Sequence, residues 1–296
     1  MKLGFSSLGC PSWDLETIIA QAAAMGFNGV ELSGLQGQTH LPALRQDAKG
    51  VAGRFRDAGV ELVCLATGNY FHWQDRGKLD EHKRQARESI ELAGELGCPF
   101  VRVFGGEVAR FEDKSVTVRC IVEALGGLAA EAAEREVTIL LENQGDFATS
   151  RHAWYILDTV NHPAVRACWH PCHAQAAGDQ PSVAIPRLGT RIALTHVVDG
   201  RFAANGTLEE YALPGAGAVD LGLTVDLLGG IGYDGYLMFD WPKSRVASLA
   251  APEEAMPAAL AKMKAMLAEL AGIKELTAYK GDKNAPRYAK AVRPVA

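Results

Sequence analysis

The chain has 296 residues, of which 48% are hydrophobic and 22% are charged, and its formal net charge at pH 7 is −5. This length suits one large α/β domain, and the composition is that of a protein with a sizeable buried core. The negative charge argues against a nucleic-acid partner, because phosphate binding usually needs an excess of Lys and Arg.

Two further features bear on the compartment. The opening residues, MKLGFSSLGC, lack the apolar run of a signal peptide, and no stretch of about 18 apolar residues predicts a membrane-spanning helix. Six scattered cysteines in such a chain are typical of reduced thiols rather than of a disulfide framework. We therefore expect a cytoplasmic protein with no membrane segment.

Strand-like and helix-like segments alternate along the whole chain. In chain order the expected strands are residues 2–7, 29–32, 60–66, 100–104, 137–142, 165–170, 192–197 and 236–240. The expected helices are residues 14–25, 41–58, 79–96, 115–135, 151–160, 182–188, 221–229 and 253–271. Eight such units predict a parallel sheet that closes into a single (β/α)8 TIM barrel. An open doubly wound sheet is the main alternative, but no Gly-rich phosphate motif opens the first helix.

The last residues differ from the rest of the chain. We expect the barrel to occupy residues 1–272 and a short basic C-terminal extension to occupy residues 273–296. The extension contains six Lys or Arg and only two acidic residues. Such a segment is either a solvated extension or an arm that crosses a subunit boundary or covers part of the barrel.

In four of the expected strands, a stretch of mostly apolar residues is followed directly by a side chain that can bind a metal. They are TILLEN (138–143), VRACWH (165–170), RIALTH (191–196) and GYLMFD (235–240), which end near Glu142, His170, His196 and Asp240. The carboxyl ends of barrel strands share one rim, so these four side chains are expected to converge. Two carboxylates and two imidazoles together predict a divalent metal site.

Each of these residues also has a less specific explanation. A single Glu or Asp after an apolar run is more often a helix cap or a loop ion pair than a metal ligand. The combination of Glu142, Asp240 and two histidines at strand ends is much harder to obtain by chance. A carboxylate buried at such a position without a partner would also be costly.

The chain resembles the sugar isomerase/epimerase barrels of the xylose-isomerase-like superfamily over nearly its whole length. The matching runs are LGCPFVRVFGG (96–106), LLEN (140–143), CWHPCH (168–173), THVVDG (195–200), LPGAGAVD (213–220) and IGYDGYLMFDW (231–241). The resemblance implies that Glu142, His170, His196 and Asp240 hold one divalent metal. It also implies that His173 and Arg201 contact the substrate.

Two positions depart from the usual family pattern, which has Asp in place of His170 and Glu in place of Asp240. The extra imidazole favours Mn, Fe, Co or Zn over Mg. In the family's two-base scheme, carboxylates on opposite sides of a ketose exchange protons while the metal stabilises an enediolate. Glu142 can be one base, whereas Asp240 is one methylene shorter than the usual second base.

These considerations favour a divalent-metal-dependent isomerase or epimerase that acts on a small keto-sugar or sugar acid. Lyase chemistry, as in decarboxylation of a β-keto sugar acid or dehydration of a keto-polyol, is the main alternative. A sugar-binding barrel without turnover is a more distant one. The related abasic-site endonucleases cluster more metal ions, and this chain offers too few candidate ligands for them. The partner is therefore expected to be a small carbohydrate, with no nucleic acid and no membrane, in a homo-oligomer.

Two more residues are candidates for contact with the substrate. His72 lies in the loop after the third strand, where it either lines the site or belongs to an exposed loop. Arg102 lies inside a strand, where a buried guanidinium requires a carboxylate partner such as Glu142 or an acid group of the substrate.

Overall fold

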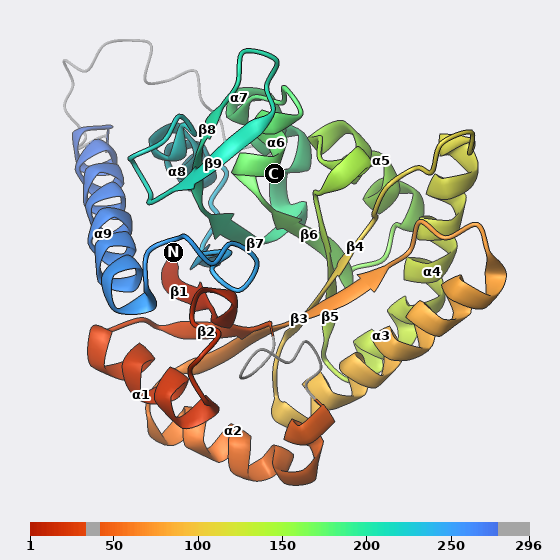
Figure 1. The fold of residues 1–296 in the computed structure, drawn as a ribbon, viewed down its shortest axis with the longest axis horizontal. Helices are drawn as coiled ribbons and strands as arrows, with labels where there is room; N and C mark the ends of the chain where they lie inside the picture. Colours follow the sequence, from red (N-terminus) through yellow and green to blue (C-terminus); the bar gives the residue numbers. More distant parts are fainter. Residues whose placement is uncertain (34–41, 278–296) are drawn as a thin grey trace, which may run out of the picture.

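The computed structural model describes residues 1–33 and 42–277. Within them, eight parallel strands close into a barrel in the order β1-β10-β7-β6-β5-β4-β3-β2 (Figure 1). The barrel strands are β1 (Lys2–Ser6), β2 (Gly29–Leu32), β3 (Glu61–Tyr70), β4 (Phe100–Phe104), β5 (Thr138–Glu142), β6 (Val165–Trp169), β7 (Ile192–Val197) and β10 (Tyr236–Phe239). The predicted single (β/α)8 barrel is confirmed.

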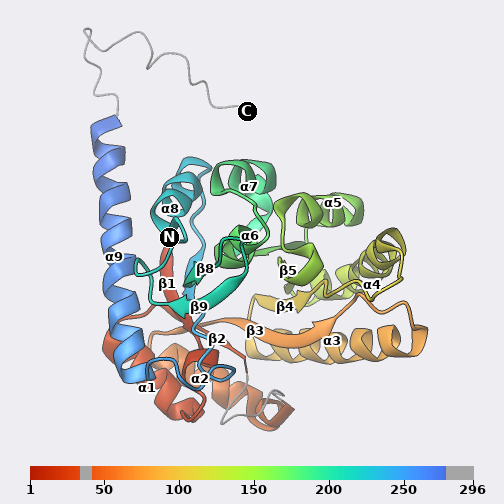
Figure 2. The same cartoon turned by 45° about the horizontal axis from the view of Figure 1, so that its top comes forward.

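Helices surround this barrel (Figures 1 and 2). They are α1 (Leu15–Met25), α2 (Ala48–Asp57), α3 (Arg76–Leu96), α4 (Lys114–Glu134), α5 (Ser150–Val160), α6 (Pro171–Ala176), α7 (Pro181–Leu188), α8 (Leu221–Gly230) and α9 (Pro252–Thr277). Short 3-10 helices occupy Ser7–Gly9, Pro42–Asp47, Gly145–Phe147 and Gly189–Arg191. Among the described helices, none combines the length and the apolar character needed to cross a bilayer.

The structure differs from the expected elements in several places, such as the unexpected short helix α6 and the longer strand β3. The predicted helix over 41–58 is divided, because Asp47 (φ −139°) leaves the helical region between the 3-10 segment and α2. An antiparallel hairpin of β8 (Asp199–Phe202) and β9 (Leu208–Ala212) follows β7 and was not expected. Helix α9 continues to Thr277, and residues 278–296 of the predicted extension lie outside the described residues.

Two apolar clusters form the core. The larger one lies between the barrel strands and the helices, whereas the smaller one consists of strand residues alone. Its members are Val63, Cys64, Leu140, Cys168, Ala193, Leu194, Tyr236 and Met238. Glu142 is in register with Cys168, and His196 is in register with Met238. The predicted polar strand ends therefore lie next to this inner apolar layer.

Close packing around β2 also affects the position of the site. A Cβ atom on Gly29 would lie 2.4 Å from Cγ2 of Val63 and 2.8 Å from the Tyr236 ring. Glycine therefore allows β2 to approach the inside of the barrel, which brings Glu31 close to the other strand ends. All six cysteines are buried and free of disulfides, as the scattered spacing predicted.

Candidate functional site

The structure brings the four predicted metal ligands together at the carboxyl ends of β5, β6, β7 and β10. Nδ1 of His196 lies 3.8 Å from Oε2 of Glu142 and 3.9 Å from Oδ2 of Asp240. Nε2 of His170 lies 3.7 Å from the same Asp240 oxygen. The side chain of Asp240 is 14% exposed, and the other three are at most 4% exposed. They form a compact and almost fully buried group.

A fifth residue, Glu31 at the end of β2, belongs to this group and was not predicted. Its Oε2 lies 3.2 Å from Nε2 of His196, and neither side chain is exposed. The hydrogen bond places the proton of the neutral His196 ring on Nε2 and leaves the lone pair on Nδ1, toward Glu142 and Asp240. Histidines that bind metals usually have such a carboxylate behind the ring.

Burial and neighbouring charge act in opposite directions on these groups. Burial alone would lower the pKa of His196, but Cys168, Glu31 and Asp240 raise it well above its ordinary value. Burial alone would raise the pKa of Asp240, yet the charge of His196 and the contact with His170 lower it. Asp240 is therefore kept ionised, and in the metal-free protein the charged form of His196, with a proton on both ring nitrogens, is favoured.

His170 is held by the turn that follows β6. Its backbone N–H donates to Oδ1 of Asn143 at 2.6 Å, and its Nδ1 accepts the backbone N–H of His173 at 3.3 Å as the N-cap of α6. The proton of the neutral ring is then on Nε2, which faces Asp240. Binding of a metal through Nε2 would require the other tautomer and loss of the N-cap hydrogen bond.

Glu142 is held from two sides. Nε of Arg102 lies 3.1 Å from Oε2 of Glu142, and both side chains are 4% exposed. Nη1 of Arg102 also donates to the carbonyl of Thr67 at 3.2 Å. On the other side, Nδ1 of His173 hydrogen-bonds to the backbone carbonyl of Asn143 at 3.1 Å and lies 3.5 Å from Oε1 of Glu142. The His173 ring stacks on His170 with centroids 3.6 Å apart. Arg102 thus has the carboxylate partner that its position in a strand predicted.

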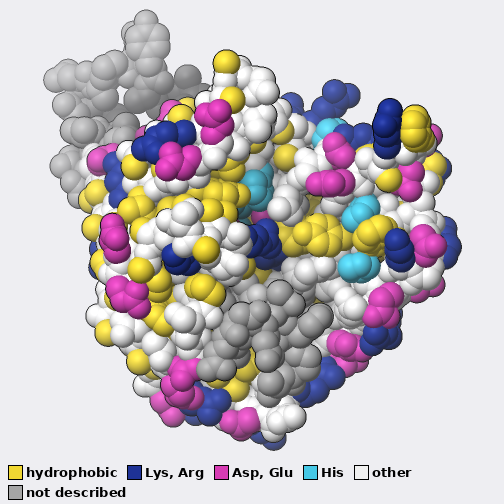
Figure 3. Space-filling model, viewed as in Figure 1, with side chains coloured by type: hydrophobic (Ala, Val, Ile, Leu, Met, Phe, Trp, Pro, Cys, Tyr) yellow, Lys and Arg dark blue, Asp and Glu magenta, His cyan; other side chains and the backbone are white. Residues whose placement is uncertain are grey.

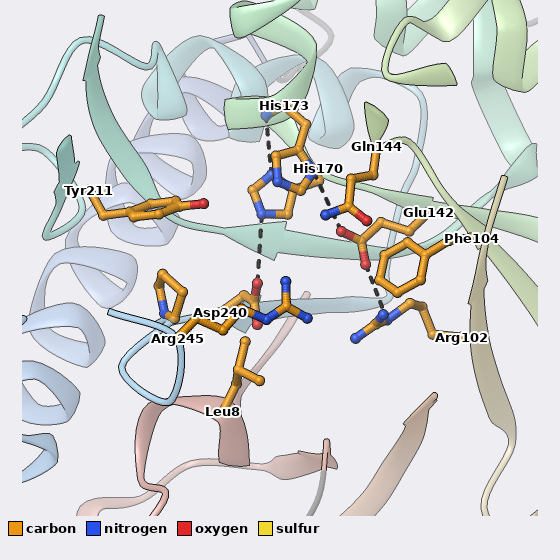
Figure 4. Close-up of a pocket in the computed structure, with 11 residues that line it drawn as sticks. Leu8, Arg102, Phe104, Glu142, Gln144, His170, His173, Tyr211, Asp240 and Arg245 are labelled. Carbon is orange, nitrogen blue, oxygen red and sulfur yellow. Dashed lines mark hydrogen bonds and ion pairs between the residues drawn. The ribbon is translucent and has the colours of Figure 1, made fainter. Parts of the chain in front are cut away.

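A narrow pocket opens above these residues (Figure 4). Predicted site residues that line it are Arg102, Glu142, His170, His173 and Asp240. Lining residues that were not predicted are Leu8, Phe104, Gln144, Tyr211, Pro242 and Arg245. Figure 3 shows histidine and basic side chains gathered near the middle of this face.

Two residues expected to contact the substrate do not line this pocket. Arg201 lies on β8, and its Nη1 contacts Oε2 of Glu210 on β9 at 2.6 Å. Its side chain is 56% exposed. His72 packs against Trp73 with ring centroids 4.2 Å apart and against the edge of Tyr70 at 5.8 Å.

The described residues fit a divalent cation. Nδ1 of His196 and Oδ1 of Asp240 are buried and have no hydrogen-bond partner within the described part of the chain. Groups of three potential ligand atoms lie within 4.8 Å of one another, among them His170, His196 and Asp240. Buried polar atoms without a hydrogen-bond partner are costly, and a cation that takes the place of the proton on Nδ1 of His196 would give both atoms a partner.

A family model for xylose isomerase-like TIM barrels matches residues 19–266. A probable endonuclease 4 of Mycobacterium ulcerans is 31% identical over 190 residues, which cover 59% of this chain and 73% of that protein. Its counterpart in Mycobacterium marinum is 31% identical over 147 residues, which cover 47% of this chain and 56% of that protein.

Solved structures resemble the chain over most of its length. The IOLI protein, in a crystal structure with a bound zinc atom, has a TM-score of 0.80 at 20% identity and covers 91% of this chain and 99% of its own. L-ribulose 3-epimerase has a TM-score of 0.79 at 18% identity, with coverages of 95% and 99%. The probable 3-DHS dehydratase AsbF of Bacillus anthracis has a TM-score of 0.73 at 16% identity, with coverages of 89% and 99%. At these identities the likeness establishes the fold alone.

Proposed function

Because this chain belongs to the family of xylose isomerase-like TIM barrels, we propose that it is a divalent-metal-dependent isomerase or epimerase of a small keto-sugar or sugar acid. The observation that carries the proposal is the buried convergence of Glu142, His196 and Asp240 beneath the pocket. Such a group of lone pairs at the carboxyl end of a barrel is where enzymes of this fold do their chemistry.

We assign the metal to Glu142, His196 and Asp240, with His170 as the fourth ligand if its ring takes the other tautomer. The nitrogen ligands favour Mn, Fe, Co or Zn over Mg. When bound, a divalent ion supplies a Lewis acid that stabilises negative charge on the oxygens of a substrate.

The chain's own residues would bind the substrate and move its protons. We assign Glu142 as a base, because it is the carboxylate that lines the pocket in contact with both Arg102 and His173. The ion pair with the guanidinium of Arg102 holds the Glu142 carboxylate in place beside the pocket. Asp240 is the second acid or base candidate. Substrate hydroxyls would be held by His173 and Arg102, whereas His72 and Arg201 lie outside the pocket lining and are not included.

Lyase chemistry is the alternative within the same site. Decarboxylation of a β-keto sugar acid or loss of water from a keto-polyol needs fewer proton transfers, which suits the shorter side chain of Asp240. The structural likeness to a probable 3-DHS dehydratase is compatible with this alternative. A barrel that binds sugar without turnover is the third possibility.

Cleavage of DNA is a separate candidate, because the curated relatives that match are probable endonuclease 4 proteins. Two observations make it the weaker one. The related abasic-site endonucleases cluster several metal ions, whereas the potential ligand groups among the described residues overlap in one cluster. The chain also has a formal charge of −5, which does not favour a DNA duplex.

Exchange of hydrogen with solvent tests the proposal directly. Manganese-loaded protein is incubated in D₂O with a panel of ketopentoses, ketohexoses and keto-sugar acids and followed by proton NMR. We expect deuterium at the carbon next to the carbonyl of at least one compound, and exchange slowed by about 100-fold or more in Glu142→Gln. Glu61→Gln, an exposed change on β3, is the matched control and should exchange like wild type.

Other outcomes separate the alternatives. Loss of carbon dioxide or water from a compound supports the lyase. Binding of a compound with neither exchange nor loss supports a barrel without turnover. Cleavage of a duplex with an abasic site, together with no reaction of any sugar, would overturn the proposal in favour of an endonuclease.

A further inference from the structure

We propose that the pocket selects a substrate with a negatively charged group, and that Arg245 binds that group; this inference rests on the proposed function. Arg245 lies in the loop between β10 and α9 and lines the pocket (Figure 4). Its side chain is exposed, and no carboxylate of the described residues forms an ion pair with it. Arg102, the other guanidinium of the pocket, is already paired with Glu142.

The charge balance of the pocket supports an anionic ligand. Its two lining carboxylates, Glu142 and Asp240, are offset by the guanidinium groups of Arg102 and Arg245. A bound divalent ion would then leave an excess of positive charge, because Glu31 offsets only one of the two added charges. In a partly desolvated pocket, such an excess favours an anionic ligand over a neutral one.

The pocket also offers one place for the charged group of a substrate and another for its reacting carbon. Glu142 and Arg102 lie at the floor of the pocket with 4% exposure, whereas Arg245 lies on its exposed side. Figure 4 shows the guanidinium of Arg245 pointing toward Asp240 and the middle of the pocket. A substrate could therefore place its charged end at Arg245 and its carbonyl carbon at Glu142.

The chemistry of a guanidinium defines the class of the charged group. Its planar N–H groups bind a carboxylate or a phosphate through two parallel hydrogen bonds. The loop after the last strand of a (β/α)8 barrel is also a common position for anion binding. The substrate class is thus a keto-sugar that carries either a carboxylate or a phosphate.

Binding measurements with three probes test this inference. Isothermal titration calorimetry on manganese-loaded protein compares 2-keto-D-gluconate, D-fructose 6-phosphate and neutral D-fructose at low and at high NaCl. We expect at least one anionic probe to bind about tenfold or more tightly than fructose, with an affinity that falls as salt rises. The anion with the larger preference identifies the source of the charge as a carboxylate or a phosphate.

Variants assign the preference to Arg245. Arg245→Gln should reduce the anion preference about tenfold or more, and Arg245→Lys should retain part of it. Arg191→Gln makes the same change of charge at an arginine that precedes β7 and pairs with Asp158, and it should behave like wild type. The manganese content of each variant is measured, so that loss of metal is not mistaken for loss of anion binding.

Each remaining outcome counts against the inference. If wild type binds fructose as tightly as both anions, or if Arg245→Gln keeps the full preference, the inference is wrong while the proposed function stands. If metal-loaded wild type binds none of the three probes, the inference and the proposed function both fail.

Discussion

Glu31 and His196 form a fully buried pair in which Oε2 of the carboxylate lies 3.2 Å from Nε2 of the imidazole. The pair fixes the ring of His196 so that its other nitrogen faces Glu142 and Asp240. A carboxylate in this position also makes the imidazole a better electron donor. The orientation of His196 in the proposed metal site is therefore set by a residue that does not itself line the pocket.

The first prediction concerns this pair. Glu31→Gln keeps the shape of the side chain but removes the charge behind His196. We expect the dissociation constant for Zn²⁺ to rise about 10- to 100-fold, as measured by competition with a chromophoric chelator. Glu61→Gln, an exposed change on the neighbouring strand β3, should leave the constant unchanged. Equal affinities in Glu31→Gln and wild type would show that the pair does not support a metal.

The second prediction concerns pH. The pKa of His196 lies well above its ordinary value, although burial alone would lower it, because Cys168, Glu31 and Asp240 favour the charged ring. A metal at Nδ1 must displace that proton, so the affinity for Zn²⁺ should increase with pH by about tenfold per unit below the raised pKa. Calorimetry in buffers of different ionisation enthalpy should show release of a proton. An affinity that does not change between pH 6 and pH 8 would contradict this assignment.

The third prediction concerns His170, where the family usually has Asp. Asp in its place can still accept the backbone N–H that Nδ1 of His170 now accepts, but it adds a carboxylate next to Asp240. We expect His170→Asp to be less stable than wild type without metal, because two like charges then lie close together. With metal, the ratio of Mn²⁺ to Zn²⁺ affinity should increase by about tenfold.

His170→Asn is the matched control for that change, since it keeps a cap acceptor without the charge. Thermal unfolding with and without each ion provides the readout. If His170→Asp and His170→Asn respond equally to Mn²⁺, position 170 does not contact the metal.

The fourth prediction concerns Asp199, which is completely buried at the start of β8. Its two oxygens accept the backbone N–H groups of Gly200, Gly215, Gly217 and Val219 at 2.8 to 2.9 Å. Asp199→Ala should lower the free energy of unfolding by about 3 kcal/mol, because these buried donors lose their acceptor. The exposed Asp234→Ala should change it by less than about 0.5 kcal/mol. Urea denaturation of both variants measures the difference.

Much of the fold could be predicted from the sequence because two regular patterns coincide. Unbroken apolar runs such as 62–66 mark strands that are covered on both faces, and these runs alternate with segments of helical periodicity. The β8–β9 hairpin was missed, although Asn205-Gly206 between its strands is a strong turn signal. The boundary within 41–58 was missed, although Asp47, which precedes α2, is a residue type that often begins a helix.

The residues of the candidate site also fall into those that the sequence indicates and those that only the structure reveals. Glu142, His170, His196 and Asp240 were found because each follows an apolar run. Glu31 was missed because it lies inside a short strand, between Val30 and Leu32, rather than after such a run. The exposed position of Arg201 depends on its cross-strand pairing with Glu210, which only the hairpin register reveals. Arg245 lies in an irregular loop, where no periodicity indicates which side chain points into the pocket.

The most direct test of the account is the metal content of purified wild type and His196→Asn, determined by elemental analysis. We expect about one Mn, Fe, Co or Zn per chain in wild type. His196→Asn should retain less than about a tenth of it while circular dichroism shows the same fold. Absence of metal from wild type even after addition of each ion, or full occupancy in folded His196→Asn, would contradict the central claim that these buried groups form a metal centre.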